Sequence, residues 1–168
     1  MPWKTRNKER QGTAIHEAGH AVIARALGIK VTSISMHNDG VSAARVKSMI
    51  PQWRPGLEAE LKLTMAGAAA QGRLSTEDVH MSTVPELESD YERIIVLAAN
   101  MAAVDAGLEW EDMAKLDVAD LNAVIRRFSD ETEALVEQHW PAIVRVAKAL
   151  MVQNWVTGAE LDRLMDLR

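Results

Sequence analysis

The sequence predicts a mainly α protein of the α+β class, with a small β hairpin or sheet after its first long helix. Three observations predict this class. Apolar residues recur at helical spacing from Ile15 to Ala26, in a run rich in alanine. Residues 29–36 are rich in the β-branched side chains that favour strands. Most of residues 117–154 are good helix formers.

The first helix is predicted to begin between Asn7 and Thr13 and to end near Leu27. Gly28 is a natural stop, because glycine readily adopts the left-handed conformation that ends many helices. Gly19, inside the helix, allows another element to pack closely. The helix therefore has a defined end and a face suited to tight packing.

A β element is predicted directly after this helix. The strand at residues 29–36 leads into Asn38-Asp39-Gly40, whose residue types favour a turn. Residues 41–49 alternate less sharply and return as a second strand. The simplest arrangement of these segments is a hairpin of neighbouring strands.

Later helices are predicted from apolar residues that recur every three or four positions. The predicted helices cover residues 56–74, residues from about 86 to 106, a short piece at 108–116, and residues from 117 onward. Residues 75–86 have no such pattern, and Pro85 favours a loop there. The run Gly67-Ala68-Ala69-Ala70 predicts a tight contact between the helix at 56–74 and a neighbouring helix.

Two local signals divide the C-terminal part of the chain. Pro141 lacks a backbone donor and clashes with the preceding turn, so one helix is predicted to end near His139 and another to carry Pro141 in its first turn. The sequence Thr157-Gly158-Ala159-Glu160 fits a capping box. It predicts a last short helix that turns Leu161 and Leu164 inward.

Composition narrows the class of protein. The 168 residues (18.6 kDa) fit one domain covering 1–168, with the polar and basic residues 1–10 expected to be disordered. The net charge of -5 argues against a nucleic-acid partner. The absence of cysteine excludes disulfides and thiolate sites, and it fits a cytoplasmic protein. No apolar run is long enough to span a bilayer, so no membrane partner is expected.

The strongest functional signal is His16-Glu17-Ala18-Gly19-His20, an H-E-x-x-H motif in the middle of the first predicted helix. Histidines four residues apart lie on the same helix face, so both imidazoles can reach one Zn²⁺ ion. Glu17 can approach the water that such an ion polarises and act as the general base. A chance motif is disfavoured, because burying these polar side chains in an apolar helix without partners costs free energy.

Two histidines do not complete a hydrolytic zinc site, which usually has three protein ligands and an open position for water. Position 26 is alanine, which excludes the signature that has a third histidine six residues after the second. His37 and His139 are expected at a turn and at a helix end. The remaining candidates lie in the loop at 75–86 or at the start of the next helix: Asp78, His80, Glu86, Glu88 and Asp90. The residue pattern alone does not choose among them.

Several segments resemble FtsH-type zinc metalloproteases. Residues 13–22, which contain the run His-Glu-Ala-Gly-His-Ala, resemble the start of that family's protease domain, whose motif is H-E-A-G-H-A. Similar segments follow at residues 31–34, 65–70, 90–101 and 157–161, so the resemblance covers most of the chain. The resemblance implies a helical, zincin-like peptidase domain. Its implied site has His16, His20 and Asp90 as zinc ligands and Glu17 as the catalytic acid and base.

The resemblance also implies ring-shaped homo-oligomers and a link to an ATP-driven unfoldase. The sequence has no G-x-x-x-x-G-K-[ST] motif, so a separate ATPase partner would have to unfold substrates for it. Residues 85–89 (Pro-Glu-Leu-Glu-Ser) stand where the family has a glycine-containing run before its aspartate.

The expected function is that of a zinc-dependent metalloendopeptidase, a hydrolase that cleaves flexible or unfolded polypeptides. A Zn²⁺-activated water would attack the peptide bond, with Glu17 as general base. An extended substrate is expected to add to an edge strand at residues 30–36 or 41–48. The alternative is a non-catalytic zinc-binding interaction or regulatory module derived from such a peptidase. The intact Glu17 favours the enzyme, because a structural zinc site has no need of a glutamate there.

Overall fold

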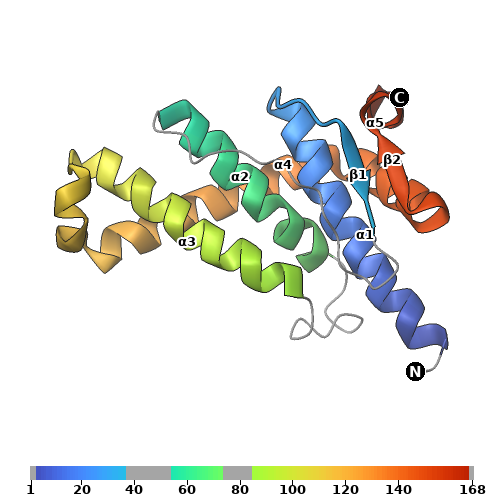
Figure 1. Cartoon of the computed structure of the whole chain (residues 1–168), viewed down its shortest axis with the longest axis horizontal. Coiled ribbons are helices and arrows are strands. Elements are labelled where there is room, and N and C mark those ends of the chain that lie inside the picture. Colours follow the sequence, from blue (N-terminus) through green and yellow to red (C-terminus); the bar gives the residue numbers. More distant parts are fainter. Residues whose placement is uncertain (1–2, 37–53, 74–84, 167–168) are drawn as a thin grey trace.

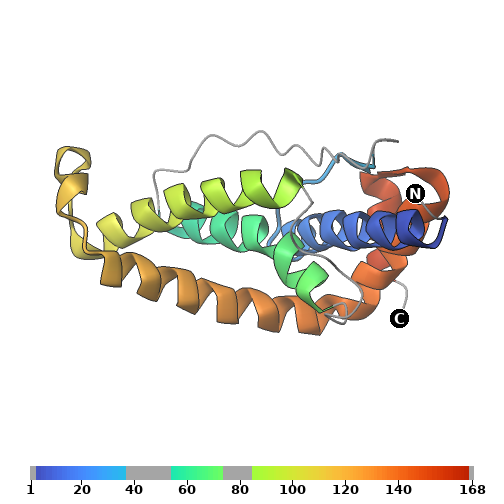
Figure 2. The same ribbon diagram turned by 90° about the horizontal axis from the view of Figure 1, so that it is seen from below.

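The computed structural model describes residues 3–36, 54–73 and 85–166. In chain order the elements are α1 (Trp3–Ala26), β1 (Ser33–Ser35), α2 (Arg54–Gly72), α3 (Pro85–Ala106), the 3-10 helix η1 (Trp110–Lys115), α4 (Val118–Gln153), β2 (Trp155–Thr157) and α5 (Gly158–Asp166). The fold is mainly α with a two-stranded antiparallel sheet, which confirms the predicted class. α2 lies between α1 and α3, and α4 runs across one side of these helices (Figures 1 and 2).

The sheet joins two distant parts of the chain. β1 pairs with β2, which precedes α5, so that Ile34 lies opposite Val156. Beyond the strands, the N–H of Gly158 donates to the carbonyl oxygen of Thr32 at 2.8 Å. The predicted strand at residues 29–36 is confirmed over Ser33–Ser35, whereas its predicted partner at 41–49 lies outside the described residues. The pairing holds the segment after α1 against the start of the last helix.

Small residues bring α1 and α2 close together. A Cβ on Gly19 would lie 2.7 Å from the carbonyl oxygen of Ala66 and 2.8 Å from the Cβ of Ala70. Real Cβ atoms do not approach other atoms so closely, so this crossing requires glycine. The tight contact that the small residues predict is therefore confirmed.

The boundaries of α1 agree only partly with the prediction. α1 begins at Trp3, several residues before the predicted range of Asn7 to Thr13. Residues 3–10, which were expected to be disordered, are therefore part of this helix. It ends at Ala26, and Gly28 has a φ of 79°, as expected for the glycine that follows a helix.

Pro85 and Pro141 differ in their positions from the prediction. Pro85 is the first residue of α3 and not part of a loop, because a proline is tolerated where the helix has no partner for its N–H. The prediction that Pro141 separates two helices is wrong, since α4 is continuous through it. Figure 2 shows that α4 bends in its C-terminal half, as an internal proline favours. The buried side chains of Val136 and Ile143 on either side of Pro141 keep this bent helix packed against the core.

The end of the chain confirms the Thr157 half of the predicted capping box, whereas Oε1 of Glu160 accepts from Nε2 of Gln153. The hydroxyl oxygen of Thr157 accepts a hydrogen bond from the N–H of Glu160 at 3.1 Å, and α5 begins between them. Leu161 is fully buried, and Leu164 packs against the same core. α5 is therefore fixed by its cap and by its apolar side.

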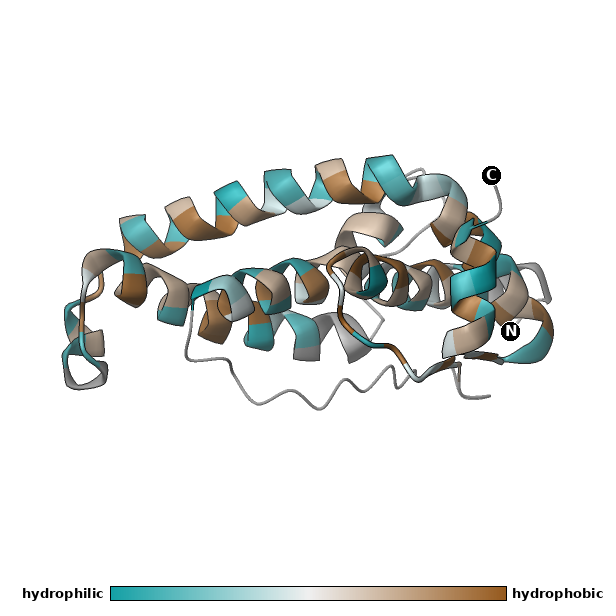
Figure 3. Ribbon diagram, turned by 90° about the horizontal axis from the view of Figure 1, so that it is seen from above, coloured by the Kyte–Doolittle hydropathy of each residue, from teal (hydrophilic) through white to brown (hydrophobic). Residues whose placement is uncertain are grey.

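Buried side chains form two clusters, and α2 contributes to both. One cluster joins α1, the sheet, α5 and the second half of α4, and the other joins α2, α3 and the first half of α4. Figure 3 shows hydrophobic and hydrophilic bands alternating along α4, as expected for a helix with one buried face. None of the described helices combines the length and the apolar character needed to cross a membrane.

Candidate metal centre

His16 and His20 project from the same face of α1. Their side chains are 1% and 14% exposed, so both lie in the interior. The two Nε2 atoms are 3.0 Å apart, and the rings stand nearly perpendicular at an interplanar angle of 84°. The four-residue spacing therefore brings one nitrogen of each ring to the same point.

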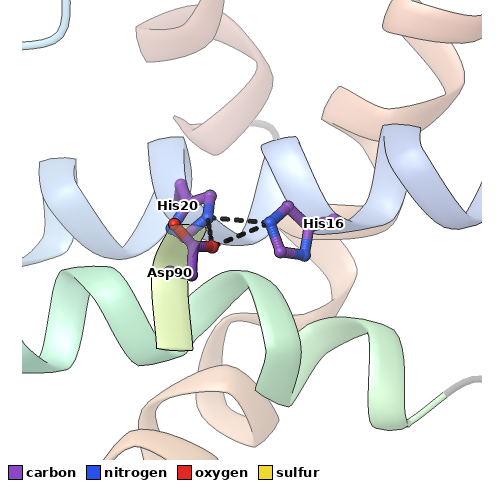
Figure 4. Close-up of side chains that lie close together, drawn as sticks. All are labelled: His16, His20 and Asp90. Atoms are coloured by element: carbon purple, nitrogen blue, oxygen red, sulfur yellow. Dashed lines mark hydrogen bonds and ion pairs between the residues drawn. The ribbon is translucent and has the colours of Figure 1, made fainter. Parts of the chain in front are cut away.

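Asp90 brings a carboxylate to this point from the second turn of α3 (Figure 4). Its Oδ2 lies 3.1 Å from Nε2 of His16 and 3.0 Å from Nε2 of His20. These three side chains form a group that could hold a metal ion. The structure thus brings together the three residues that the FtsH resemblance named as ligands.

The structure describes no side chain for the other candidates for the third ligand. Glu86 and Glu88 belong to the first turn of α3, but their side chains lie outside the described part. Asp78 and His80 precede the described start of α3, and His37 also lies outside the described ranges. His139, which was expected at a helix end, lies within the continuous α4.

Hydrogen bonds alone cannot satisfy the triangle of Nε2, Nε2 and Oδ2. A neutral imidazole has one N–H. His20 uses its N–H at Nδ1, which donates to the carbonyl oxygen of Leu63 at 2.8 Å. If His20 is neutral, its Nε2 therefore presents a lone pair to the carboxylate of Asp90. If His20 is protonated, its Nε2–H can donate to Asp90, but Nε2 of His16 then either presents a lone pair to Asp90 or points its own proton at that of His20. One side of the triangle is repulsive in each of these states. A cation at the centre would make all three contacts favourable.

The size of the triangle fits zinc. Ligand atoms at about 2.0–2.1 Å from a tetrahedral Zn²⁺ lie roughly 3.3 Å from one another. The observed separations are 3.0–3.1 Å. Two imidazole nitrogens and one carboxylate oxygen also form a common donor set for catalytic zinc. The residues present therefore fit this ion in both spacing and chemistry.

The pKa of His20 indicates that its ring binds a proton when no metal ion is bound. Burial alone would lower the pKa of His20, but the hydrogen bond and charge of Asp90 together with the charge of Glu17 raise it to about 9. Burial opposes ionisation of Asp90, but the two histidines hold its pKa well below the usual range. At pH values well below 9 this pairs an imidazolium with a carboxylate, and a metal ion that binds there has to displace the proton.

Glu17 is buried on α1 beside the two histidines. Its residue is 3% exposed, and its Oε2 has no hydrogen-bond partner among the described residues. Its charge contributes to the raised pKa of His20, so the carboxylate acts on the site electrostatically. A buried carboxylate oxygen without a partner costs free energy and requires an explanation beyond folding.

Gly67 on α2 makes room for the site. A Cβ at this position would collide with Nε2 of His20 and would lie 2.7 Å from Nε2 of His16. The absence of a side chain thus leaves the two ring nitrogens space to meet. Sequence reasoning assigned Gly67 only to helix packing and missed this role.

A cavity of about 320 Å³ lies beside the site. Its lining includes His20 and Asp90 of the site and residues Val31–Ser33 of the segment that enters β1. The candidate metal centre and the segment that enters β1 therefore share one cavity.

Comparison with known proteins finds a similarity to a zinc metalloprotease. No family model matches the sequence. The chain is 25% identical over 189 residues to the ATP-dependent zinc metalloprotease FtsH of Acidimicrobium ferrooxidans, and the alignment covers 95% of this chain. The chain is similar to part of a zinc metalloprotease. It spans 28% of the length of that relative.

An ion pair beside Asp90 was not found from the sequence. Nε of Arg93, one turn after Asp90 on α3, donates to Oε1 of Glu60 on α2 at 3.1 Å. Glu60 is 6% exposed, and both residues line the cavity. The pair ties the start of α3 to α2 and so helps to position Asp90. Nothing in the spacing of Glu60 and Arg93 along the chain indicates that they meet.

Proposed function

We propose that residues 1–168 form a zinc metallopeptidase domain that hydrolyses peptide bonds in flexible or unfolded polypeptides. The observation that carries this proposal is the convergence of His16, His20 and Asp90 within 3.1 Å of one another, with the buried Glu17 adjacent in sequence to His16. The similarity to FtsH supports both the metal and the reaction class.

His16 and His20 would hold the ion through Nε2, and Asp90 would hold it through Oδ2. Zinc bound there supplies Lewis acidity that polarises a water molecule and the substrate carbonyl. Three protein ligands are typical of a catalytic zinc site, which keeps one position open. The carbonyl of Leu63 holds the tautomer of His20 that directs its Nε2 lone pair to the site.

Glu17 is the proposed general base. Its carboxylate would accept a proton from the attacking water as the water oxygen bonds to the peptide carbonyl carbon. The same proton would pass to the amine nitrogen as the C–N bond breaks. The unpaired Oε2 supports this role, because it is a buried acceptor that no described residue occupies.

The polypeptide would lie extended in the cavity beside residues 30–33. Backbone groups of these residues can bind an extended chain as a further strand would, which fixes its direction without selecting its sequence. The second segment expected to bind substrate, 41–48, lies outside the described residues. Delivery of substrate by an ATPase partner belongs to the same proposal and is supported by the similarity to an ATP-dependent relative. Homo-oligomers are proposed only because the sequence resembles that family.

The test replaces Glu17 by glutamine, which keeps the shape of the side chain and removes the base. The zinc-loaded E17Q variant is compared with the wild-type protein for cleavage of an unstructured casein. We expect cleavage to fall by about 10²–10⁴-fold with the zinc content unchanged. Glu9→Gln is the matched control, because Glu9 is an exposed glutamate on the same helix and its loss should leave cleavage unchanged.

The results for zinc content and cleavage distinguish the metallopeptidase from a non-catalytic zinc module and from a chance motif. Equal cleavage by E17Q and wild type would refute the mechanism. Stoichiometric zinc without any cleavage by the wild type would favour the non-catalytic zinc-binding module. The absence of zinc from the purified wild type would favour a chance motif.

A further inference from the structure

The two histidines differ at their second ring nitrogen. Nδ1 of His20 donates to the carbonyl oxygen of Leu63, whereas Nδ1 of His16 is buried without a hydrogen-bond partner among the described residues. Figure 4 shows this nitrogen on the side of the His16 ring that faces away from His20 and Asp90. A histidine that binds a metal almost always donates from its second nitrogen to an acceptor, which fixes its tautomer. His16 therefore lacks a partner that its proposed role requires.

Gln71 on α2 has a buried acceptor atom that lacks a donor. Its residue is 2% exposed, and its Oε1 is buried without a partner among the described residues. Only two further buried side-chain atoms are unpaired in the described part: Oε2 of Glu17, which is the proposed base, and Oγ1 of Thr132 on α4. An unpaired buried acceptor and an unpaired buried donor therefore occur on the two helices that cross at the site.

The packing of α1 against α2 puts these two groups on adjacent turns. Gly67 faces His16, since a Cβ on Gly67 would lie 2.7 Å from its Nε2. Gln71 is one turn after Gly67, and Gly12 is one turn before His16. A Cβ on Gly12 would lie 3.4 Å from Nε2 of Gln71, so the amide lies against α1 one turn from His16. Neighbouring turns on one face are about 5–6 Å apart, which an amide spans directly or through one water molecule.

We propose that Gln71 is a positioning residue for the metal centre: its Oε1 accepts the Nδ1 proton of His16, directly or through one buried water. A half-turn of the amide exchanges Oε1 and Nε2 at little steric cost, because the two ends have nearly the same shape. The bond fixes the tautomer of His16 in which the lone pair of Nε2 faces His20 and Asp90. The inference rests on the proposed function for the presence of the ion.

The test compares two substitutions of Gln71 with a control. Gln71→Met keeps the length of the side chain and removes the acceptor, whereas Gln71→Glu keeps an acceptor. Thr132→Val is the matched control, because it removes another unpaired buried polar atom, on α4. The readouts are the zinc affinity, measured by competition with a chelator of known affinity, and the ¹⁵N and N–H signals of the His16 ring in the zinc-loaded protein.

We expect Gln71→Met to bind zinc about 10–100-fold more weakly than the wild type, which is the usual effect of losing an outer partner of a ligand. We expect its His16 Nδ1–H signal to exchange rapidly with solvent. Gln71→Glu should bind zinc at least as tightly as the wild type, and Thr132→Val should match the wild type.

Zinc affinity of Gln71→Met within about twofold of the wild type would overturn this inference alone. An equal loss in Thr132→Val would also overturn it, because the effect would then come from packing. Failure of the wild type to bind zinc would overturn the proposed function as well. If Gln71→Met does not fold, Gln71→Glu decides: wild-type affinity supports the inference, and a tenfold loss in a folded protein overturns it.

Discussion

Nε2 of His20 lies 3.0 Å from Oδ2 of Asp90, although seventy residues separate them along the chain. His20 belongs to α1 and Asp90 to α3, and each of these helices packs against α2. The distance between the two atoms therefore depends on two helix contacts as well as on local sequence. The metal affinity should report on this tertiary arrangement.

Asp90→Asn tests the third ligand. The amide keeps the shape of the side chain but loses the charge, so zinc affinity should fall by more than roughly 100-fold, since losing an outer partner alone costs 10–100-fold. Asp162→Asn is the control, because Asp162 forms an ion pair with Arg25 on α1 and does not belong to the metal group. Zinc content and chelator competition provide the measurements. Wild-type affinity in Asp90→Asn would exclude this carboxylate as a ligand.

The affinity for zinc should rise with pH. The pKa of His20 is about 9 in the ion-free protein, above its ordinary value of 6.5, so at pH 7.5 the ring holds a proton that zinc must displace. Affinity should therefore increase about tenfold per pH unit up to pH 9. Calorimetry in buffers of different ionisation enthalpy should detect release of about one proton per ion at pH 7.5. Binding without proton release would contradict the paired state of the site.

The ion-free protein should show the opposite trend in stability. Because folding raises the pKa of His20, its protonation stabilises the fold fully below about pH 6.5, and this contribution is lost as the pH rises through 9. Urea unfolding of the chelated protein at pH 6.5 and pH 9 measures the difference. A more stable ion-free protein at pH 9 would argue against this assignment.

Gly67→Ala tests the space that the site requires. The added methyl group would collide with the rings of His16 and His20, so zinc affinity should fall sharply and the free energy of unfolding should decrease by about 1–3 kcal/mol. Gly72→Ala is the matched control on the same helix, because a Cβ there meets no atom within 4 Å. The control should be neutral or stabilising by up to about 1 kcal/mol. Equal zinc affinities in the two variants would contradict the proposed role of Gly67.

Arg93→Met tests the ion pair that holds α3 near α2. Loss of the guanidinium leaves the buried carboxylate of Glu60 without this partner, which should cost about 1–3 kcal/mol of unfolding free energy. The double variant with Glu60→Met should recover part of this loss, since no charge then remains buried. Urea unfolding of both variants measures the effect. A double variant less stable than the sum of the two single changes would show that the pair is not the cause.

Helix ends, caps and the spacing of side chains on a helix could be predicted because they depend on only a few consecutive residues. The left-handed Gly28 follows from the conformational freedom of glycine, and the cap at Thr157 follows from a hydroxyl three residues before a glutamate. The meeting of His16 and His20 follows from the helical repeat. Each of these features needs only the geometry of a few consecutive residues.

The remaining features depend on tertiary contacts that no short pattern contains. The pairing of β1 with β2 involves three residues from each of two distant segments, too few to give a periodic signal. α4 continues through Pro141 because the packed side chains on both sides outweigh the lost hydrogen bond. The choice of Asp90 required a resemblance to a known family, because the residue pattern alone left several carboxylates equivalent.

The sequence contains no cysteine and so can form no disulfide. A zinc ion shared by His20 and Asp90 would close a loop of seventy residues and restrict the unfolded chain much as a disulfide does. For a disulfide, a loop of this length corresponds to about 4 kcal/mol of stabilisation. The proposed catalytic ion would then also act as a reversible cross-link between α1 and α3. Removing the metal would abolish the proposed activity and also weaken the attachment of α3 to α1.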